Sequence, residues 1–340
     1  MTSQAPENPP QTPPQTPPKT PPETSPKAPS APAPSQEPHL IPAAPSFMGL
    51  PTIAPREAQP GDIVIVGASN CTPYEPGKPS HAADAPGALR TAVERFIPWA
   101  THHDFDTGGP LLPDRRLFDA GDIATHPDQP DVNRDAIRAT VATLREADAI
   151  PIVIGGDDAV PIPVFEAMAD GPPFWIVQVD AHIDWCEERH GERLGWSSTM
   201  RRASEHAAVQ GIVQVGIRGV GSAGADEVHA AQTWGAHILT AQHIAANGIG
   251  AALDLVPAGA RTFITIDCDA LDPAMMPAVL AKAPGGLTYQ NVSDLILGLG
   301  LRTQLIGMNV VELVPHLDID KVSAKTAARF ITHMFNAARR

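Results

Sequence analysis

The sequence has few cysteines, no long apolar run and no excess of basic residues. Its three cysteines, Cys71, Cys186 and Cys268, are scattered along 340 residues, which argues against a disulfide framework and is typical of a reducing cytoplasm. No apolar run approaches the ~18 residues of a membrane span, and the N-terminus lacks the basic-then-apolar pattern of a signal peptide. The net charge of −14 argues against nucleic-acid binding and is compatible with a cationic ligand. We therefore expect a cytoplasmic protein that binds neither nucleic acids nor membranes.

Proline, in contrast, is abundant, and it is concentrated near the N-terminus. The first part of the chain repeats Pro-Pro with Thr, Gln, Lys and Ser, and it contains almost no large apolar residue before Leu40. Such a segment cannot bury enough apolar surface to offset the entropy of ordering. We expect residues 1–46 to form a disordered, partly polyproline-II tail and residues 47–340 to form one folded domain.

Short β-branched runs alternate with amphipathic segments in the rest of the chain. The runs predict strands at residues 62–67, 119–123 (a short edge strand), 150–154, 174–179, 212–217, 236–240, 262–266 and 305–313. Helical spacing predicts helices at residues 86–97, 133–148 (capped by Asn133), 201–206, 223–234, 288–301 (capped by Thr288) and 320–338. Strands that alternate with helices predict an α/β fold, in which helices cover both faces of a parallel sheet.

Four of the predicted strands end in acidic residues. In chain order these groups are Asp158, then Asp180 with His182 and Asp184, then Asp267 with Asp269, and finally Glu312. The carboxyl ends of parallel strands share one edge of a sheet, so these side chains are expected to converge. A polar turn explains any one of these ends, but it explains all four poorly.

A convergence of this kind predicts a metal site. Carboxylates at close range repel one another and raise each other's pKa, and two divalent cations bridged by shared carboxylates would remove that repulsion. Such a pair would also generate a hydroxide nucleophile at neutral pH. Oxygen-rich ligation with one imidazole favours Mn²⁺ over Zn²⁺, with Ni²⁺ and Co²⁺ as alternatives.

Four motifs resemble those of the ureohydrolase family, which includes arginase, agmatinase and guanidino-acid hydrolases. They are GGDD (155–158), DAHID (180–184), TIDCDALDP (265–273) and GMNVVELVP (307–315), and the resemblance extends from about residue 50 to the C-terminus. It implies a catalytic domain of three α/β/α layers around a mostly parallel eight-stranded sheet. It also implies two Mn²⁺ ions that bridge a hydroxide, which attacks a guanidinium carbon, and a trimeric or hexameric assembly.

The resemblance also assigns roles to residues of this chain. One ion would be held by Asp158, Asp180, Asp184 and Asp267, and the other by Asp180, His182, Asp267 and Asp269, so that Asp180 and Asp267 bridge the two. Glu312 matches the carboxylate that pairs with the guanidinium of the substrate, a planar fork suited to bidentate contact.

The chain departs from the family pattern at three positions. Asp158 stands where a ligand histidine is usual, and Asn309 stands where an aspartate is common. Trp196 falls where the family has a histidine that relays protons or contacts the substrate, so His190 or a water would have to substitute. Glu312 and His190 are therefore the candidate catalytic residues, and Glu312 and Trp196 are the candidate substrate contacts.

These observations predict an enzyme that hydrolyses a C–N bond of a guanidine-type substrate with two Mn²⁺ or Ni²⁺ ions. Candidate substrates are a guanidino compound, an agmatine-like amine, an alkylguanidine or a biguanide such as metformin, which would release urea, a substituted urea or guanylurea. Trp196 favours a more apolar or compact substrate than arginine or agmatine. Two alternatives stay open: a helper subunit of a hetero-oligomer, suggested by the two lost histidines, and a formimino or amide hydrolase of the same family. We expect a homo- or hetero-oligomer.

Overall fold

The computed structural model describes residues 38–221 and 223–338. Most of the predicted disordered tail, residues 1–46, lies outside the described residues. Within them, strand β1 (Leu40–Ile41) pairs antiparallel with strand β5 (Leu117–Ile123), and Phe47 is buried. The part of the chain that belongs to the main sheet therefore begins before the predicted domain boundary at residue 47.

The main sheet has nine strands within the described residues, in the order β1-β5-β2-β6-β11-β10-β7-β8-β9. All neighbours except β1 and β5 run parallel, which confirms the predicted mostly parallel sheet, to which β1 adds a ninth, antiparallel strand. The prediction that residues 119–123 form an edge strand is wrong, because β1 covers β5 and is too short to leave a periodic signal. The remaining strands are β2 (Ile63–Ala68), β6 (Ile150–Gly155), β7 (Phe174–Val179), β8 (Val209–Ile217), β9 (His237–Thr240), β10 (Arg261–Asp267) and β11 (Gln304–Val311). A separate hairpin pairs β3 (His103–Asp104) with β4 (Gly109–Pro110).

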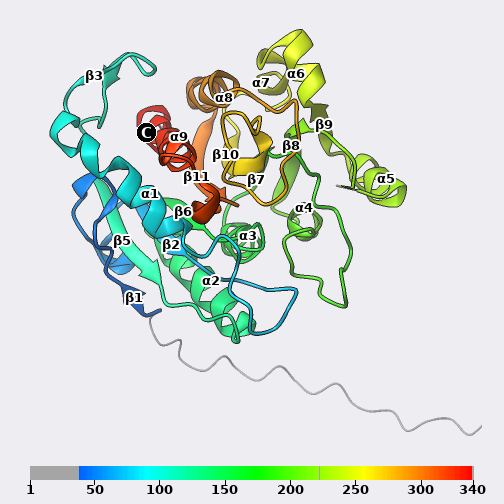
Figure 1. Ribbon diagram of the computed structural model, residues 1–340, viewed down its shortest axis with the longest axis horizontal. Coiled ribbons are helices and arrows are strands. Elements are labelled where there is room, and N and C mark those ends of the chain that lie inside the picture. Colours follow the sequence, from blue (N-terminus) through cyan, green and yellow to red (C-terminus); the bar gives the residue numbers. More distant parts are fainter. Residues whose placement is uncertain (1–37, 222, 339–340) are drawn as a thin grey trace, which may run out of the picture. The chain divides into compact units, whose positions relative to one another are not determined.

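Helices cover both faces of the sheet and make three layers (Figure 1). Strand residues alternate between two hydrophobic clusters: Ile63 and Ile65 of β2 belong to one, and Val64 and Val66 belong to the other. The first cluster includes residues of α1 (Ala85–Val93), α6 (Ala241–Asn247), α7 (Gly250–Leu253), α8 (Tyr289–Arg302) and α9 (Val322–Ala337). The second includes residues of α2 (Pro130–Glu146), α3 (Pro161–Ala169), α4 (Thr199–Ala203) and α5 (Ala225–Trp234).

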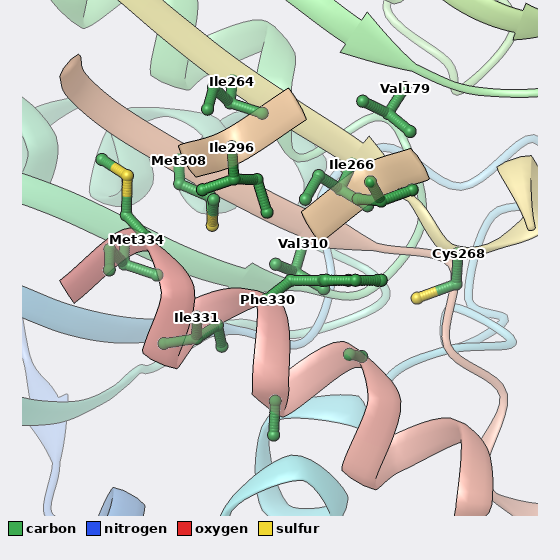
Figure 2. Close-up of a cluster of buried hydrophobic side chains, with 14 of the residues drawn as sticks. Val179, Ile264, Ile266, Cys268, Ile296, Met308, Val310, Phe330, Ile331 and Met334 are labelled. Carbon is green, nitrogen blue, oxygen red and sulfur yellow. The ribbon is translucent and has the colours of Figure 1, made fainter. Parts of the chain in front are cut away.

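In the first cluster, α8 and α9 pack against the middle strands of the sheet. Figure 2 shows Val310 of β11 beside Phe330 of α9, and Ile264 and Ile266 of β10 and Met308 of β11 lie in the same cluster; all of them are buried. Burial of each such side chain contributes about 1.5–3 kcal/mol. The strands that carry the acidic residues are thus held from the helix side by apolar packing. No helix in the described part of the chain is both long enough and apolar enough to cross a membrane.

Several helix ends differ from the predictions. Helix α2 begins at Pro130 with Gln129 as its N-cap, so the prediction of Asn133 as the cap is wrong. The buried Asn133 amide instead donates to the backbone oxygens of Cys71 and His126. Thr288 caps α8 as predicted, since its Oγ accepts from the backbone N–H of Asn291 at 3.1 Å. Helix α3 was not predicted, because its early prolines resemble a loop and its buried surface lacks a polar face.

A buried ion pair joins α1 to β5. The Arg90 guanidinium donates to both carboxylate oxygens of Asp119 at 2.8 and 2.9 Å, and both side chains are almost fully buried. Asp119 also accepts hydrogen bonds from the backbone N–H groups of Phe47 and Gly121. One carboxylate thus connects the segment that enters the domain, the sheet and the first helix.

Replacing Asp119 with alanine should lower the free energy of unfolding by ~3–5 kcal/mol, because the buried Arg90 keeps only its pair with Asp122 and two backbone N–H groups lose their acceptor. Urea denaturation of Asp119→Ala measures the loss. The control is Asp254→Ala, which removes the exposed pair with Arg302 and should cost less than ~1 kcal/mol. Equal effects of the two substitutions would contradict the structural role of the Arg90–Asp119 pair.

Candidate metal centre

The four strands that end in acidic residues are adjacent in the sheet. Their order is β6-β11-β10-β7, so their carboxyl ends form one continuous edge. Asp158 follows β6, Asp180 follows β7, Asp267 ends β10 and Glu312 follows β11. The predicted convergence is therefore a direct consequence of strand order.

Two groups of ligand atoms lie close enough together to hold a cation. Asp158, Asp180 and Asp267 each offer an atom within 4.8 Å of the others, and Asp180, His182 and Asp269 do the same. Asp180 belongs to both groups, which is the arrangement that a bridging carboxylate requires. The four aspartates of these groups are at most 4% exposed, and Oδ2 of Asp158 has no hydrogen-bond partner among the described residues. A buried, unpaired carboxylate oxygen beside other carboxylates fits a hard divalent cation.

Two glutamines in the sheet orient the aspartates that follow β7. Nε2 of Gln178 donates to Asp180 at 2.8 Å and to Asp184 at 2.7 Å. Gln214 on β8, opposite Gln178 in the sheet register, donates to Oε1 of Gln178 and to the backbone oxygen of Ile183. These contacts fix both side-chain amides, so the carboxylates of Asp180 and Asp184 are held before any ligand arrives.

Burial is the main cause of unusual pKa values at this edge. It raises the pKa of Asp158, Asp184 and Asp267 well above the ordinary aspartate value, and the charges of neighbouring carboxylates raise it further. Burial lowers the pKa of His182, but hydrogen bonds to Asp180 and Asp269 outweigh it and raise that pKa to about 12. A dication among these groups would stabilise the ionised carboxylates and the neutral imidazole.

Close backbone contacts shape the same edge. A Cβ at Gly156 would lie 2.3 Å from the backbone oxygen of Ser69, so only glycine allows β6 to turn here beside the loop that follows β2. Asp184 and Glu312 have φ values of 50° and 64°, a region that costs non-glycine residues ~1–3 kcal/mol. Backbone strain of this kind clusters at functional sites, and here it directs two acidic side chains toward a common space.

A cavity of about 700 Å³ lies over the acidic edge. Glu312 lies in its wall, and Oε1 of this carboxylate accepts a hydrogen bond from the backbone N–H of Asp158 at 3.0 Å. Trp196 and His190, the two other predicted site residues, line the same cavity, and both rings contact the ring of Tyr74.

His81 is a further residue of this cavity, and the motifs in the sequence did not predict it. It lines the cavity, and its Nε2 is hydrogen-bonded to Oε2 of Glu312. Burial lowers the pKa of His81, but the bond to Glu312 and the charge of Glu312 raise it above the ordinary histidine value. Strand β2 ends at the same edge as β6, but His81 lies far along the loop after β2, so the pattern of acidic strand ends does not point to it.

The third position that departs from the family pattern, Asn309, lies below this edge. It is fully buried on β11, opposite Thr265 of β10, and neither amide atom has a hydrogen-bond partner among the described residues. Asn309 is thus part of the sheet interior and not of the cavity wall.

Comparisons with known proteins agree with this geometry. Residues 61–336 match a family model described as the arginase family. Proclavaminate amidinohydrolase of Streptomyces clavuligerus is 29% identical over 290 residues, 81% of this chain and 86% of that protein. A solved structure of that enzyme has a TM-score of 0.74 and 26% identity, and the match covers 89% of this chain and 99% of that one. An agmatinase of Bacillus cereus is 29% identical over 227 residues, 66% of this chain and 76% of that protein. A Trypanosoma cruzi formiminoglutamase solved with Mn²⁺ shares the fold, with a TM-score of 0.71 and 22% identity over 86% of this chain and 98% of that one.

The shared position of Asp180 predicts different metal losses for two substitutions. Asp180→Asn should lose both ions, because its carboxylate belongs to both ligand groups, whereas Asp158→Ala should lose one. Elemental analysis of purified, metal-loaded protein measures the number of ions per chain. The surface substitution Asp170→Ala serves as the control and should retain both ions. Two tightly bound ions in Asp180→Asn would contradict the shared site.

Proposed function

Since the chain belongs to the arginase family, we propose that this ureohydrolase-family enzyme hydrolyses a C–N bond of a small guanidine-type compound at a pair of divalent cations. One observation carries the proposal: two ligand groups share the buried Asp180, and their other members, Asp158, Asp267, His182 and Asp269, line a cavity that the Glu312 carboxylate also lines. The first feature suits a pair of metal ions, and the second suits a planar cationic substrate.

The proposed ligands follow the two groups and the neighbouring aspartates. One ion would be held by Asp158, Asp180, Asp184 and Asp267, and the other by Asp180, His182, Asp267 and Asp269. The bound ions would supply Lewis acidity and lower the pKa of a water molecule. Ligand type favours Mn²⁺, the ion present in the formiminoglutamase structure, over Ni²⁺.

The chain's own residues would bind and orient the substrate. The Glu312 carboxylate would accept N–H groups of a guanidinium and hold its plane against the acidic edge. Trp196 would form an apolar part of the wall and exclude water from one side of the bound group. An alkylguanidine, a biguanide or a compact guanidino acid fits this combination better than arginine does, because a polar side chain is replaced by an indole.

A second candidate activity is hydrolysis of a formimino group. The formiminoglutamase that shares the fold supports it, since a formimino carbon is also bonded to two nitrogens that Glu312 could bind. The products distinguish the two activities, because a guanidine releases urea or a substituted urea, whereas a formimino compound releases formamide.

The proposed function is tested with the full chain loaded separately with Mn²⁺ and Ni²⁺. The substrates are guanidine, methylguanidine, metformin, guanidinopropionate, agmatine, arginine and formiminoglutamate, and the products are identified by mass spectrometry. We expect urea, a substituted urea or guanylurea from at least one compact guanidine, and loss of turnover in Asp180→Asn. Turnover of formiminoglutamate alone would favour the second candidate. Inactivity of the metal-loaded chain toward all compounds would contradict an independent enzyme and indicate a helper subunit.

A further inference from the structure

Glu312 is held by the protein at both of its carboxylate oxygens. Oε1 accepts from the backbone N–H of Asp158 at 3.0 Å, and Oε2 is bonded to Nε2 of His81. An ionised carboxylate offers about four lone-pair sites, so about two remain for a ligand. Two parallel N–H groups of a planar guanidinium match that number.

The loop that carries His81 is fixed next to β6. Oγ of Ser80 accepts from the backbone N–H of Asp157 at 3.0 Å, and the backbone N–H of Ser80 donates to the side chain of Asn70 at 3.0 Å. The His81 ring lies edge-on to Trp196, with ring centroids 5.5 Å apart, and its side chain is 19% exposed. His81 is thus held by the loop, by the indole and by Glu312, and it still faces the cavity.

We infer that His81 is a positioning residue for substrate binding, which holds the Glu312 carboxylate so that its remaining lone pairs face the guanidinium. This inference rests on the proposed function. The imidazole comes from the loop between β2 and α1, whereas position 196, where the family has a histidine, holds a tryptophan. Trp196 then supports this role, because its indole packs against the His81 ring, which orients Glu312.

His190 is the competing source of an imidazole. It lines the same cavity, but its ring contacts Tyr74, and Glu312 is bonded to His81. Substitutions can therefore distinguish the roles of the two histidines, because each can be changed without altering the residues that the other contacts.

The test compares His81→Phe, which keeps a ring beside Trp196 but removes the donor, with His81→Gln, which keeps an N–H donor of similar reach. Loss of a hydrogen bond to a charged group predicts that His81→Phe lowers kcat/KM about 10- to 100-fold. Affinity for guanidinium, measured by calorimetry, should fall by a similar factor, while the metal content stays unchanged. His81→Gln should recover most of both quantities. The exposed His243→Phe is the matched control and should behave as the unsubstituted protein.

The inference is overturned if His81→Phe retains full turnover and guanidinium affinity, if His81→Gln is as impaired as His81→Phe, or if His190→Gln loses both quantities while His81→Phe does not.

Should His81→Phe fail to fold, His81→Ala assayed with and without added imidazole replaces it. Recovery of turnover by imidazole supports the inference, and absence of recovery contradicts it. If the unsubstituted protein turns over no guanidine, the proposed function fails, and guanidinium binding alone then decides about His81. In that case, weaker guanidinium binding by the His81 variants alone supports the role of His81. Equal binding by the His81 variants and the unsubstituted protein, or no binding by any of the proteins, contradicts that role.

Discussion

The repulsion between buried carboxylates at one edge of the sheet determines what this site can bind. Asp158, Asp180, Asp267 and Asp269 are nearly inaccessible to solvent, and burial together with mutual repulsion raises the pKa of Asp158 and Asp267 far above the ordinary value. An edge of this kind is stable with ionised side chains only when cations compensate the charge. The proposed pair of divalent ions therefore accounts for the site's composition as well as for its chemistry.

The surrounding structure keeps these groups in place. Apolar packing of α8 and α9 holds β10 and β11 from one side, and the Gln178–Gln214 pair orients the carboxylates that follow β7. Glu312 is oriented in a different way, by the backbone of Asp158 and by His81. The backbone hydrogen bond from Asp158 to Glu312 thus joins the proposed metal ligands to the proposed substrate carboxylate.

The sequence predicted the sheet and the acidic groups because both follow from local patterns. Apolar runs that end in aspartate mark strand ends. Because the carboxyl ends of parallel strands lie at one edge of the sheet, the aspartates at these ends are expected to lie close together. His81 could not be found in this way, because its position depends on how the loop after β2 folds against β6 through Ser80. The strand Leu40–Ile41 was not predicted because two residues show no periodicity. The N-cap Gln129 was not predicted because its side chain makes no capping hydrogen bond, and glutamine is not a typical cap.

If the proposed site is right, two cations occupy this edge on either side of one shared carboxylate. Anomalous scattering from crystals grown with Mn²⁺ tests it most directly. We expect two strong peaks, about 3.5–4 Å apart, that both contact Asp180, one of them near Asp158 and the other near His182 and Asp269. A single peak, or peaks that leave Asp180 without a metal contact, would contradict it.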